Sequence, residues 1–266
     1  MGKVKNRWLI ALSAVGIHLS IGSVYAYSVM TIPLNRLHGW LKSDVTFAFS
    51  IAILFLGFSA AFLGPWVERM GPRNSGRLAA VFYSLGIIGS GLAVKSGSLP
   101  LFILCYGVIG GIGLGVGYIT PVSTLVKWFP DRRGLATGMA IMGFGFAAML
   151  FGPIMAKLFQ LMDIWKVYIL LGVVYFCLIT CSSLYIAPPP KGWLPKGMRE
   201  APAGAGDETA PKRAVRRDLA QMTVKEAIRT KRFYFMWVML FINITCGIAL
   251  ISVASPDYYH AEQSIA

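Results

Sequence analysis

The sequence predicts an all-α protein that crosses a membrane several times. Its 266 residues are 56% hydrophobic, and its mean hydropathy is +0.64. The apolar residues form successive runs of about 20, the length that a helix needs to cross a bilayer, and a soluble domain of this size does not carry such runs one after another. The positive charges lie in the segments between the runs, which is the pattern of a polytopic membrane protein.

Seven apolar runs are long enough to be membrane-spanning helices. We expect them at residues 8–32, 45–67, 75–94, 100–126, 134–158, 165–187 and 233–254. A polar loop is expected at 33–44, and tight turns are expected at 68–74 and 95–99. An N-terminal signal peptide is the alternative for the first run, because Val24-Tyr25-Ala26 resembles a cleavage site. The run is too long for that, and further spans follow it.

The turn between the fourth and fifth spans is the most distinctive segment. Residues 127–134 read Lys-Trp-Phe-Pro-Asp-Arg-Arg-Gly, and glycine-rich apolar runs flank them on both sides. Pro130 cannot continue the fourth span, and Asp131 is a good N-cap for the fifth. Trp128 and Phe129 stand where aromatic residues of a membrane interface are expected.

The composition changes after the sixth span and divides the chain into three parts. Residues 1–187 form a six-helix unit. Residues 188–231 are rich in proline, glycine, alanine and charge, so we expect a partly disordered cytoplasmic linker that ends in a short amphipathic helix at 223–230. Residues 232–266 hold the seventh helix and a polar tail.

The Lys and Arg residues predict the orientation. If the N-terminus is cytoplasmic, 20 of the 25 lie inside and 5 outside, and the bias persists as 9 against 5 when the linker is left out. This predicts a multi-pass protein of the cell (inner) membrane with a cytoplasmic N-terminus. The net charge of +14 does not indicate nucleic-acid binding, because the charges are confined to the loops and linker.

Several chemistries are excluded by missing patterns. The four cysteines lie inside apolar runs without CxxC spacing, so neither a zinc site nor a disulfide framework is indicated. The sequence has no HExxH or GxSxG motif, and the first six spans contain no Asp or Glu. We therefore predict that the protein is not an enzyme and needs no metal or cofactor.

Few polar groups lie within the spans, and His18 is the most notable. His18, Gly22 and Tyr25 share one helix face. A histidine at this depth points into the bundle, and two roles stay open: a substrate or coupling group, or a neutral histidine bonded to a neighbouring helix. Glycine recurs every seven residues in the fifth span, and the fourth span has glycines four apart. Such stripes let helices pack closely, which we expect of Gly138, Gly145 and Gly152.

Two stretches resemble the major facilitator superfamily of secondary transporters. Residues 64–73, Gly-Pro-Trp-Val-Glu-Arg-Met-Gly-Pro-Arg, are similar to its signature G-x-x-x-D-R-x-G-R-R between the second and third spans, with Glu68 for Asp and Pro72 for one basic residue. The resemblance implies a cytoplasmic conformational clamp that biases one of two transporter states. Its members would be Gly64, Glu68, Arg69, Gly71 and Arg73.

The second stretch, residues 127–138, resembles the oxalate/formate antiporter branch and its monocarboxylate-transporting relatives. The resemblance implies twelve helices in two halves with the substrate between them, so this chain would supply the N-terminal half and one further helix. It places Tyr25 and Tyr118 on aromatic positions of the central cavity, and Phe144 on a third where the oxalate carrier has a tyrosine. The family's basic residues that pair with substrate carboxylates come from the second half.

Two functions of different classes follow. The first is alternating-access transport of small organic anions, such as lactate, pyruvate, formate or oxalate, by a carrier of which this chain is the N-terminal portion. The second is a non-transporting membrane module, either a half-transporter that needs a separate C-terminal half or a truncation product. The expected partners are the anion, the lipid bilayer and that missing half.

Overall fold

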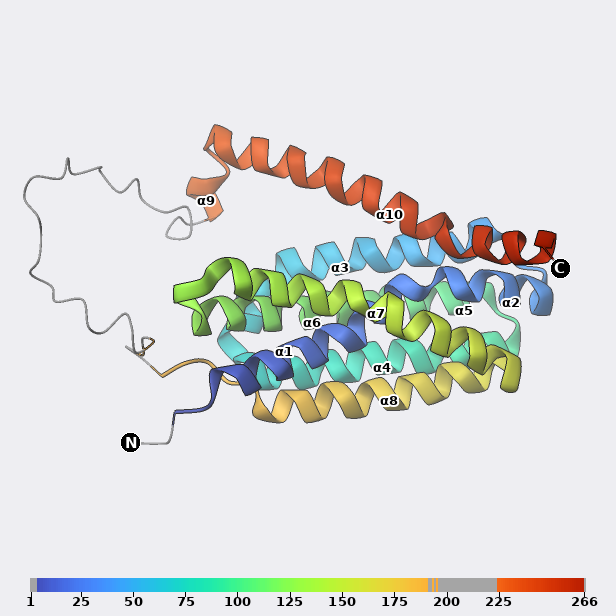
Figure 1. Cartoon of the computed structure of the whole chain (residues 1–266), viewed down its shortest axis with the longest axis horizontal. Helices are drawn as coiled ribbons and strands as arrows, with labels where there is room; N and C mark the ends of the chain where they lie inside the picture. Colours follow the sequence, from blue (N-terminus) through green and yellow to red (C-terminus); the bar gives the residue numbers. More distant parts are fainter. Residues whose placement is uncertain (1–3, 191–192, 194, 196–223, 266) are drawn as a thin grey trace, which may run out of the picture.

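In the computed structural model, which describes residues 4–190, 193, 195 and 224–265, every regular element is a helix. This confirms the all-α fold class. Seven helical segments of the described chain are long and apolar enough to cross a membrane. The first six run along one common long axis and enclose a shared apolar core (Figure 1). The elements of these six spans are α1 (Arg7–Ile21), η1 (Gly22–Ala26), α2 (Ser28–His38), α3 (Lys42–Met70), α4 (Pro72–Ser96), α5 (Leu99–Phe102), η2 (Ile103–Ile109), α6 (Gly110–Trp128), η3 (Pro130–Arg132), α7 (Arg133–Leu161) and α8 (Ile164–Tyr185).

The first span is interrupted and longer than predicted. A 3₁₀ segment, η1, separates α1 from α2, and α2 continues through Pro33 to His38. The polar loop predicted at 33–44 is therefore wrong, because only residues 39–41 lie between α2 and α3. Proline gives up one backbone hydrogen bond within a helix. Met30 and Leu34 are buried in the core, and this packing holds the helix beyond the proline.

The connections between spans are shorter than the sequence suggested. Gly71 alone separates α3 from α4, and its φ of 78° lies in a region that glycine adopts without strain. Gly97 ends α4 with a φ of 69°. The charged residues on either side of Gly71, which we assigned to a turn at 68–74, belong to the ends of the two helices.

The fourth span contains a π-helical segment, η2, and packs closely through its glycines. A Cβ atom on Gly107 would lie 2.7 Å from the Ile51 side chain of α3, and one on Gly111 would lie 2.7 Å from that of Phe55. A Cβ on Gly113 would collide with the backbone of Tyr83 in α4. The small stripes predicted for this span thus form its contacts with α3 and α4.

Within the described chain, the corresponding contacts of the fifth span are found at one of the three predicted positions. Gly138 and Gly145 are exposed on α7, and a Cβ on either would meet no atom of the described chain within 4 Å. Gly152 is buried and a Cβ there would reach Val29 at 4.0 Å. The face of α7 that packs in the bundle instead carries Gly143, whose added Cβ would lie 3.2 Å from that of His18.

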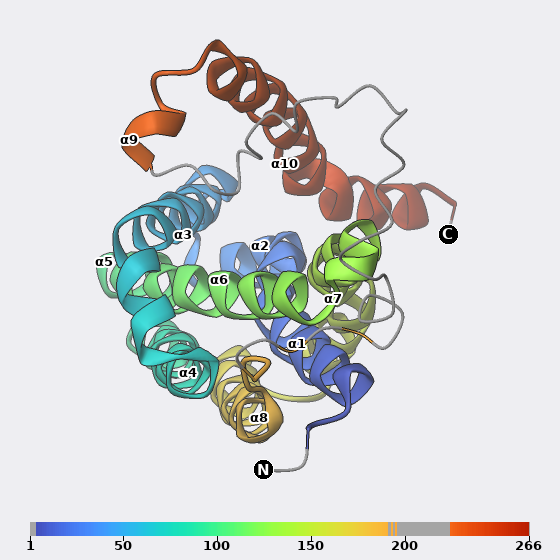
Figure 2. The ribbon, with the colours of Figure 1, turned by 90° about the vertical axis from the view of Figure 1, so that its left-hand side faces the viewer.

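The last two elements are α9 (Val224–Ala227) and α10 (Lys231–Ile265). The short α9 falls within the amphipathic helix predicted at 223–230, and the rest of the expected linker lies largely outside the described residues. The α10 helix begins near the predicted start but continues into the expected polar tail. It contacts the bundle at α2 and otherwise stands apart from it (Figure 2). None of its side chains between residues 231 and 250 is buried.

Candidate functional site

Four aromatic rings from four elements meet where the first span faces α6 and α7. Phe144 of α7 contacts the other three: its ring centroid lies 4.8 Å from Tyr25, 5.7 Å from Tyr118 and 5.9 Å from His18, in edge-to-face arrangements. His18 also stacks on Tyr118 at 5.4 Å. The structure therefore brings together the four residues that the sequence singled out for the central cavity. We call them the His18 cluster.

The members of the His18 cluster differ in exposure. His18 is fully buried, Phe144 is 5% exposed, and Tyr25 and Tyr118 are half-buried. A molecule that approaches the cluster would therefore reach the side chains of Tyr25 and Tyr118, whereas the imidazole of His18 is buried.

Each ring nitrogen of His18 faces a backbone carbonyl oxygen of a different helix. Nδ1 lies 2.7 Å from the carbonyl oxygen of Ala140 in α7, and Nε2 lies 3.1 Å from that of Tyr118 in α6. A neutral imidazole has one N–H and donates to one of these oxygens, whereas an imidazolium donates to both. The sequence left two roles open for His18. These two contacts favour the second, a neutral histidine bonded to a neighbouring helix.

Two small residues let the first span approach α7 closely enough to form the cluster. Gly22 in η1 lies against the backbone of Phe144, and a Cβ there would collide with the Phe144 carbonyl oxygen. Gly143 gives the same space beside His18. The sequence placed Gly22 on the face of His18, but nothing in a single sequence indicated that the chain changes to 3₁₀ geometry at this point.

The basic turn at residues 127–134 is tied to the start of α1. Arg7 donates to Asp131 at 3.0 Å and 3.2 Å, and its guanidinium lies 5.1 Å from the Phe129 ring centroid. Asp131 does not cap α7, because a 3₁₀ turn intervenes and Arg132 occupies the N-cap position. The predicted capping role is therefore wrong.

The two aromatic residues of this turn are buried within the protein. Trp128 is 1% exposed and its Nε1 donates to the Ala187 carbonyl at 2.7 Å, so it joins the end of α6 to the chain beyond α8. Phe129 has no exposed surface and contacts Trp8 edge to face. Their aromatic character indicated a helix end, where Phe129 packs against the start of α1 and Trp128 against Trp193.

The residues expected to form the conformational clamp lie at the same end of the bundle. Glu68 pairs with Lys127 at 3.5 Å, which joins the end of α3 to the end of α6. Both side chains are 54% exposed, so the pair contributes at most about 1 kcal/mol. A Cβ atom on Gly64 would lie 3.8 Å from the side chain of Ile119 in α6. Arg69 and Arg73 are exposed.

Lys5, two residues before α1, makes a further contact with the bundle. Its Nζ donates to the Tyr185 carbonyl at 2.7 Å, at the C-terminal end of α8, where a cation is favourable. Burial, and secondly the positive charge of Arg73, lower the pKa of Lys5. The cluster, the turn and these ties involve no group of three or more His, Cys, Asp or Glu side chains positioned for a metal within the described chain.

The fold and its seven apolar helices define a multi-pass α-helical membrane protein. The sequence matches the profile of the Major Facilitator Superfamily over residues 12–265, and the chain belongs to that superfamily. The resemblance read from residues 64–73 and 127–138 is thereby confirmed at the level of the superfamily.

Three relatives indicate the neighbourhood within the superfamily. The chain is 26% identical over 250 residues to the uncharacterized MFS-type transporter YhjX of Escherichia coli, which covers 94% of this chain and 57% of the relative. It is 24% identical over 256 residues to the oxalate:formate antiporter of Oxalobacter formigenes, with 96% and 56% covered. It is 23% identical over 178 residues to human monocarboxylate transporter 14, with 66% and 34% covered. The chain thus spans about half the length of the first two relatives.

Proposed function

We propose that this chain is the substrate-binding N-terminal part of a carrier for small organic anions, such as oxalate, formate, lactate or pyruvate. The observation that carries the proposal is the His18 cluster, in which two half-buried phenols from different helices both contact Phe144. Phenol hydroxyls donate to carboxylate oxygens, and a hydrogen bond to a charged group contributes about 1.5–3 kcal/mol. The names of two relatives, an oxalate:formate antiporter and a monocarboxylate transporter, support the same substrate class.

The transport test joins residues 1–230 to the corresponding second half of the Oxalobacter antiporter. Proteoliposomes with this carrier should accumulate at least one of the four labelled anions in a saturable manner. The combined variant Tyr25→Phe and Tyr118→Phe should lower uptake by about tenfold or more. The loss of each charge-assisted hydrogen bond weakens substrate binding by a factor of that order.

Tyr185→Phe serves as the matched control, because Tyr185 lies at the far end of α8 and belongs to no contact of the His18 cluster. Its uptake should equal that of the parent carrier. Unchanged uptake in the doubly substituted carrier would contradict the assignment of Tyr25 and Tyr118. A folded parent carrier that moves none of the four anions would contradict the substrate class.

The alternative is a membrane module that does not transport by itself. The uncovered faces of α7 and α10 favour it, because they offer surface for another set of helices. We expect the 266-residue chain to show no carboxylate uptake in vesicles, since a carboxylate held away from water needs a cation or several strong donors. Saturable uptake by this chain would show that its own helices suffice.

We further propose a cytoplasmic N-terminus in the cell membrane, from the distribution of Lys and Arg. The clamp residues and the basic turn would then face the cytoplasm. Reporter fusions at Lys191 and Ala266 should report opposite sides, cytoplasmic for Lys191, because α10 lies between them. Two reports from the same side would contradict a seven-span arrangement.

A further inference from the structure

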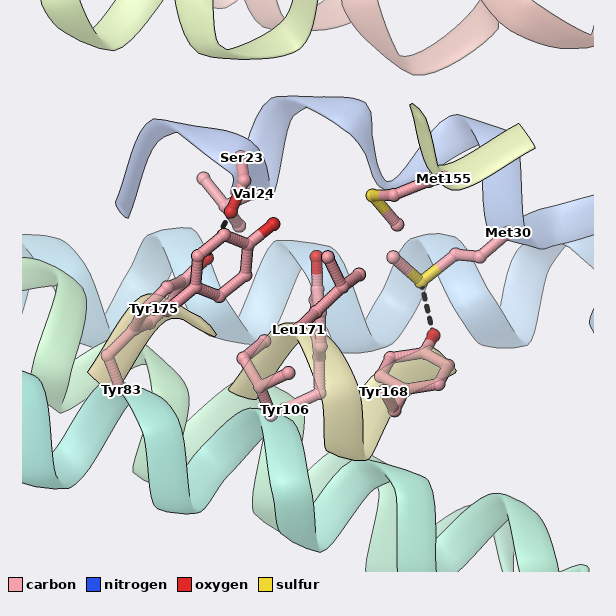
Figure 3. Close-up of a pocket in the computed structure, with 10 residues that line it drawn as sticks. Ser23, Val24, Met30, Tyr83, Tyr106, Met155, Tyr168, Leu171 and Tyr175 are labelled. Atoms are coloured by element: carbon pink, nitrogen blue, oxygen red, sulfur yellow. Dashed lines mark hydrogen bonds between the residues drawn. The ribbon is translucent and has the colours of Figure 1, made fainter. Parts of the chain in front are cut away.

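A small cavity lies inside the bundle, apart from the His18 cluster. Its volume is about 10 Å³, which is enough for about one water molecule. Figure 3 shows side chains from α4, η2 and α8 converging on it from the side opposite the first span. Tyr83, Tyr106, Tyr168 and Tyr175 all line it.

The hydroxyl of Tyr83 is already engaged on the first span. Ser23 in η1 donates its single hydroxyl proton to the Ser20 carbonyl at 2.7 Å. In the 2.8 Å contact between Ser23 and Tyr83, Tyr83 must therefore be the donor. The Tyr83 oxygen keeps a free lone pair, so it accepts a hydrogen bond from anything polar in the cavity.

Two other hydroxyls at the cavity have no partner. Tyr106 is 4% exposed and Tyr175 is 2% exposed. The hydroxyl oxygen of each is inaccessible and makes no hydrogen bond of acceptable geometry within the described chain, although Ser23 lies near that of Tyr175. A buried hydroxyl without a partner is costly, and native proteins pair such groups with protein atoms or with ordered water. By contrast, Tyr168 faces the sulfur of Met30.

We propose that this cavity binds an ordered water molecule that pairs with the hydroxyls of Tyr106 and Tyr175. Water has two donors and two acceptors, and the Tyr83 oxygen supplies a third partner, the number that a buried water typically has. The cavity is too small for an organic anion, and no charged side chain lines it. This site is independent of the proposed transport function.

The water links the two irregular segments of the bundle. Tyr106 belongs to the π-helical η2, and Ser23 to the 3₁₀ segment η1. A water that hydrogen-bonds Tyr106, Tyr175 and Tyr83 connects η2, α8 and α4, and Tyr83 continues the chain of hydrogen bonds to Ser23. The segment that presents Tyr25 to the His18 cluster is thus held from its opposite side by a hydrated tyrosine network.

The first test is radiolytic hydroxyl labelling of the purified 266-residue chain, because a bound water beside a buried tyrosine is a local source of radicals. Tyr106 and Tyr175 should be labelled above background. Tyr27 has no exposed surface and does not line the cavity, so it is the internal control and should stay at background. Background labelling at Tyr106 and Tyr175 would overturn the proposal.

The second test is the sign of the thermal shift in Tyr106→Phe and Tyr175→Phe. With water bound, each substitution removes a satisfied hydrogen bond and lowers the unfolding temperature by about 2–4 °C. In a dry cavity, each removes an unpaired hydroxyl, and the temperature stays the same or rises. Tyr83→Phe should lower it in either case and so shows that the assay detects one hydrogen bond. If only Tyr83→Phe lowers the unfolding temperature, the proposal is overturned.

Discussion

Gly113→Ala should lower the stability and the folded yield of the protein. Gly113 lies in α6 where that helix touches the backbone of Tyr83 in α4, and an added Cβ would collide with the Tyr83 nitrogen and Cα atoms. Backbone atoms cannot rotate away as the end of a side chain can, so the two helices must separate. Overpacking of this kind costs about 1–3 kcal/mol or more. Monodisperse yield in detergent and the unfolding temperature of the purified chain measure the loss.

Gly145→Ala is the matched control for this prediction. It makes the same chemical change in an exposed position of α7, where an added Cβ would meet no described atom within 4 Å. Alanine is the better helix former by about 1 kcal/mol, so yield should stay the same or improve. Equal losses in both variants would mean that another helix covers Gly145, as the seven-residue spacing originally suggested.

The contrast between these glycines shows what spacing alone can predict. Glycines four apart in the fourth span and seven apart in the fifth both indicated close helix contact, yet among the described residues only the first set has it throughout. Periodicity fixes which residues share a face, but it does not say which face turns toward the bundle. Gly143, which packs beside His18, belongs to neither stripe, so no regular spacing marked it.

The spans themselves were predictable because hydropathy over about 20 residues is a strong signal. The predicted ends were less accurate, mostly by two to four residues, since the charged and proline residues that suggested loops continue the helices. Pro33 is the clearest case. The 3₁₀ and π segments depend on how neighbouring helices fit together, and the sequence carries no local pattern for them.

The four residues of the His18 cluster were singled out from the sequence, but their arrangement was not. Tyr25, Tyr118 and Phe144 came from a family resemblance, and His18 from the rarity of ionisable groups in a membrane span. The complete burial of His18, its two carbonyl partners and the second group of tyrosines around Tyr106 all require long-range contacts. A lone tyrosine in an apolar run does not reveal whether its hydroxyl has a partner.

Substitutions at His18 should lower stability in the order Asn, Gln, Leu, with Leu the most harmful. The shorter contact, 2.7 Å from Nδ1 to Ala140, is the better hydrogen bond. A second proton on this fully buried ring would add a hydrogen bond but bury a charge, which costs several kcal/mol. The neutral ring with its proton on Nδ1 is therefore favoured. The Asn amide nitrogen reproduces the Nδ1 position, and the Gln amide nitrogen reproduces Nε2.

Asn should therefore keep most of the stability, while Leu loses the contacts to both α6 and α7. One buried hydrogen bond contributes about 0.5–1.5 kcal/mol, so His18→Leu should lower the unfolding temperature by roughly 2–6 °C. Nitrogen NMR of histidine-labelled protein, compared with the His18→Asn variant, reads the tautomer directly. A protonated Nε2, or a His18→Gln variant more stable than His18→Asn, would mean that the ring donates to the Tyr118 carbonyl oxygen instead. Two protonated nitrogens would mean that the three helices are joined by a buried cation.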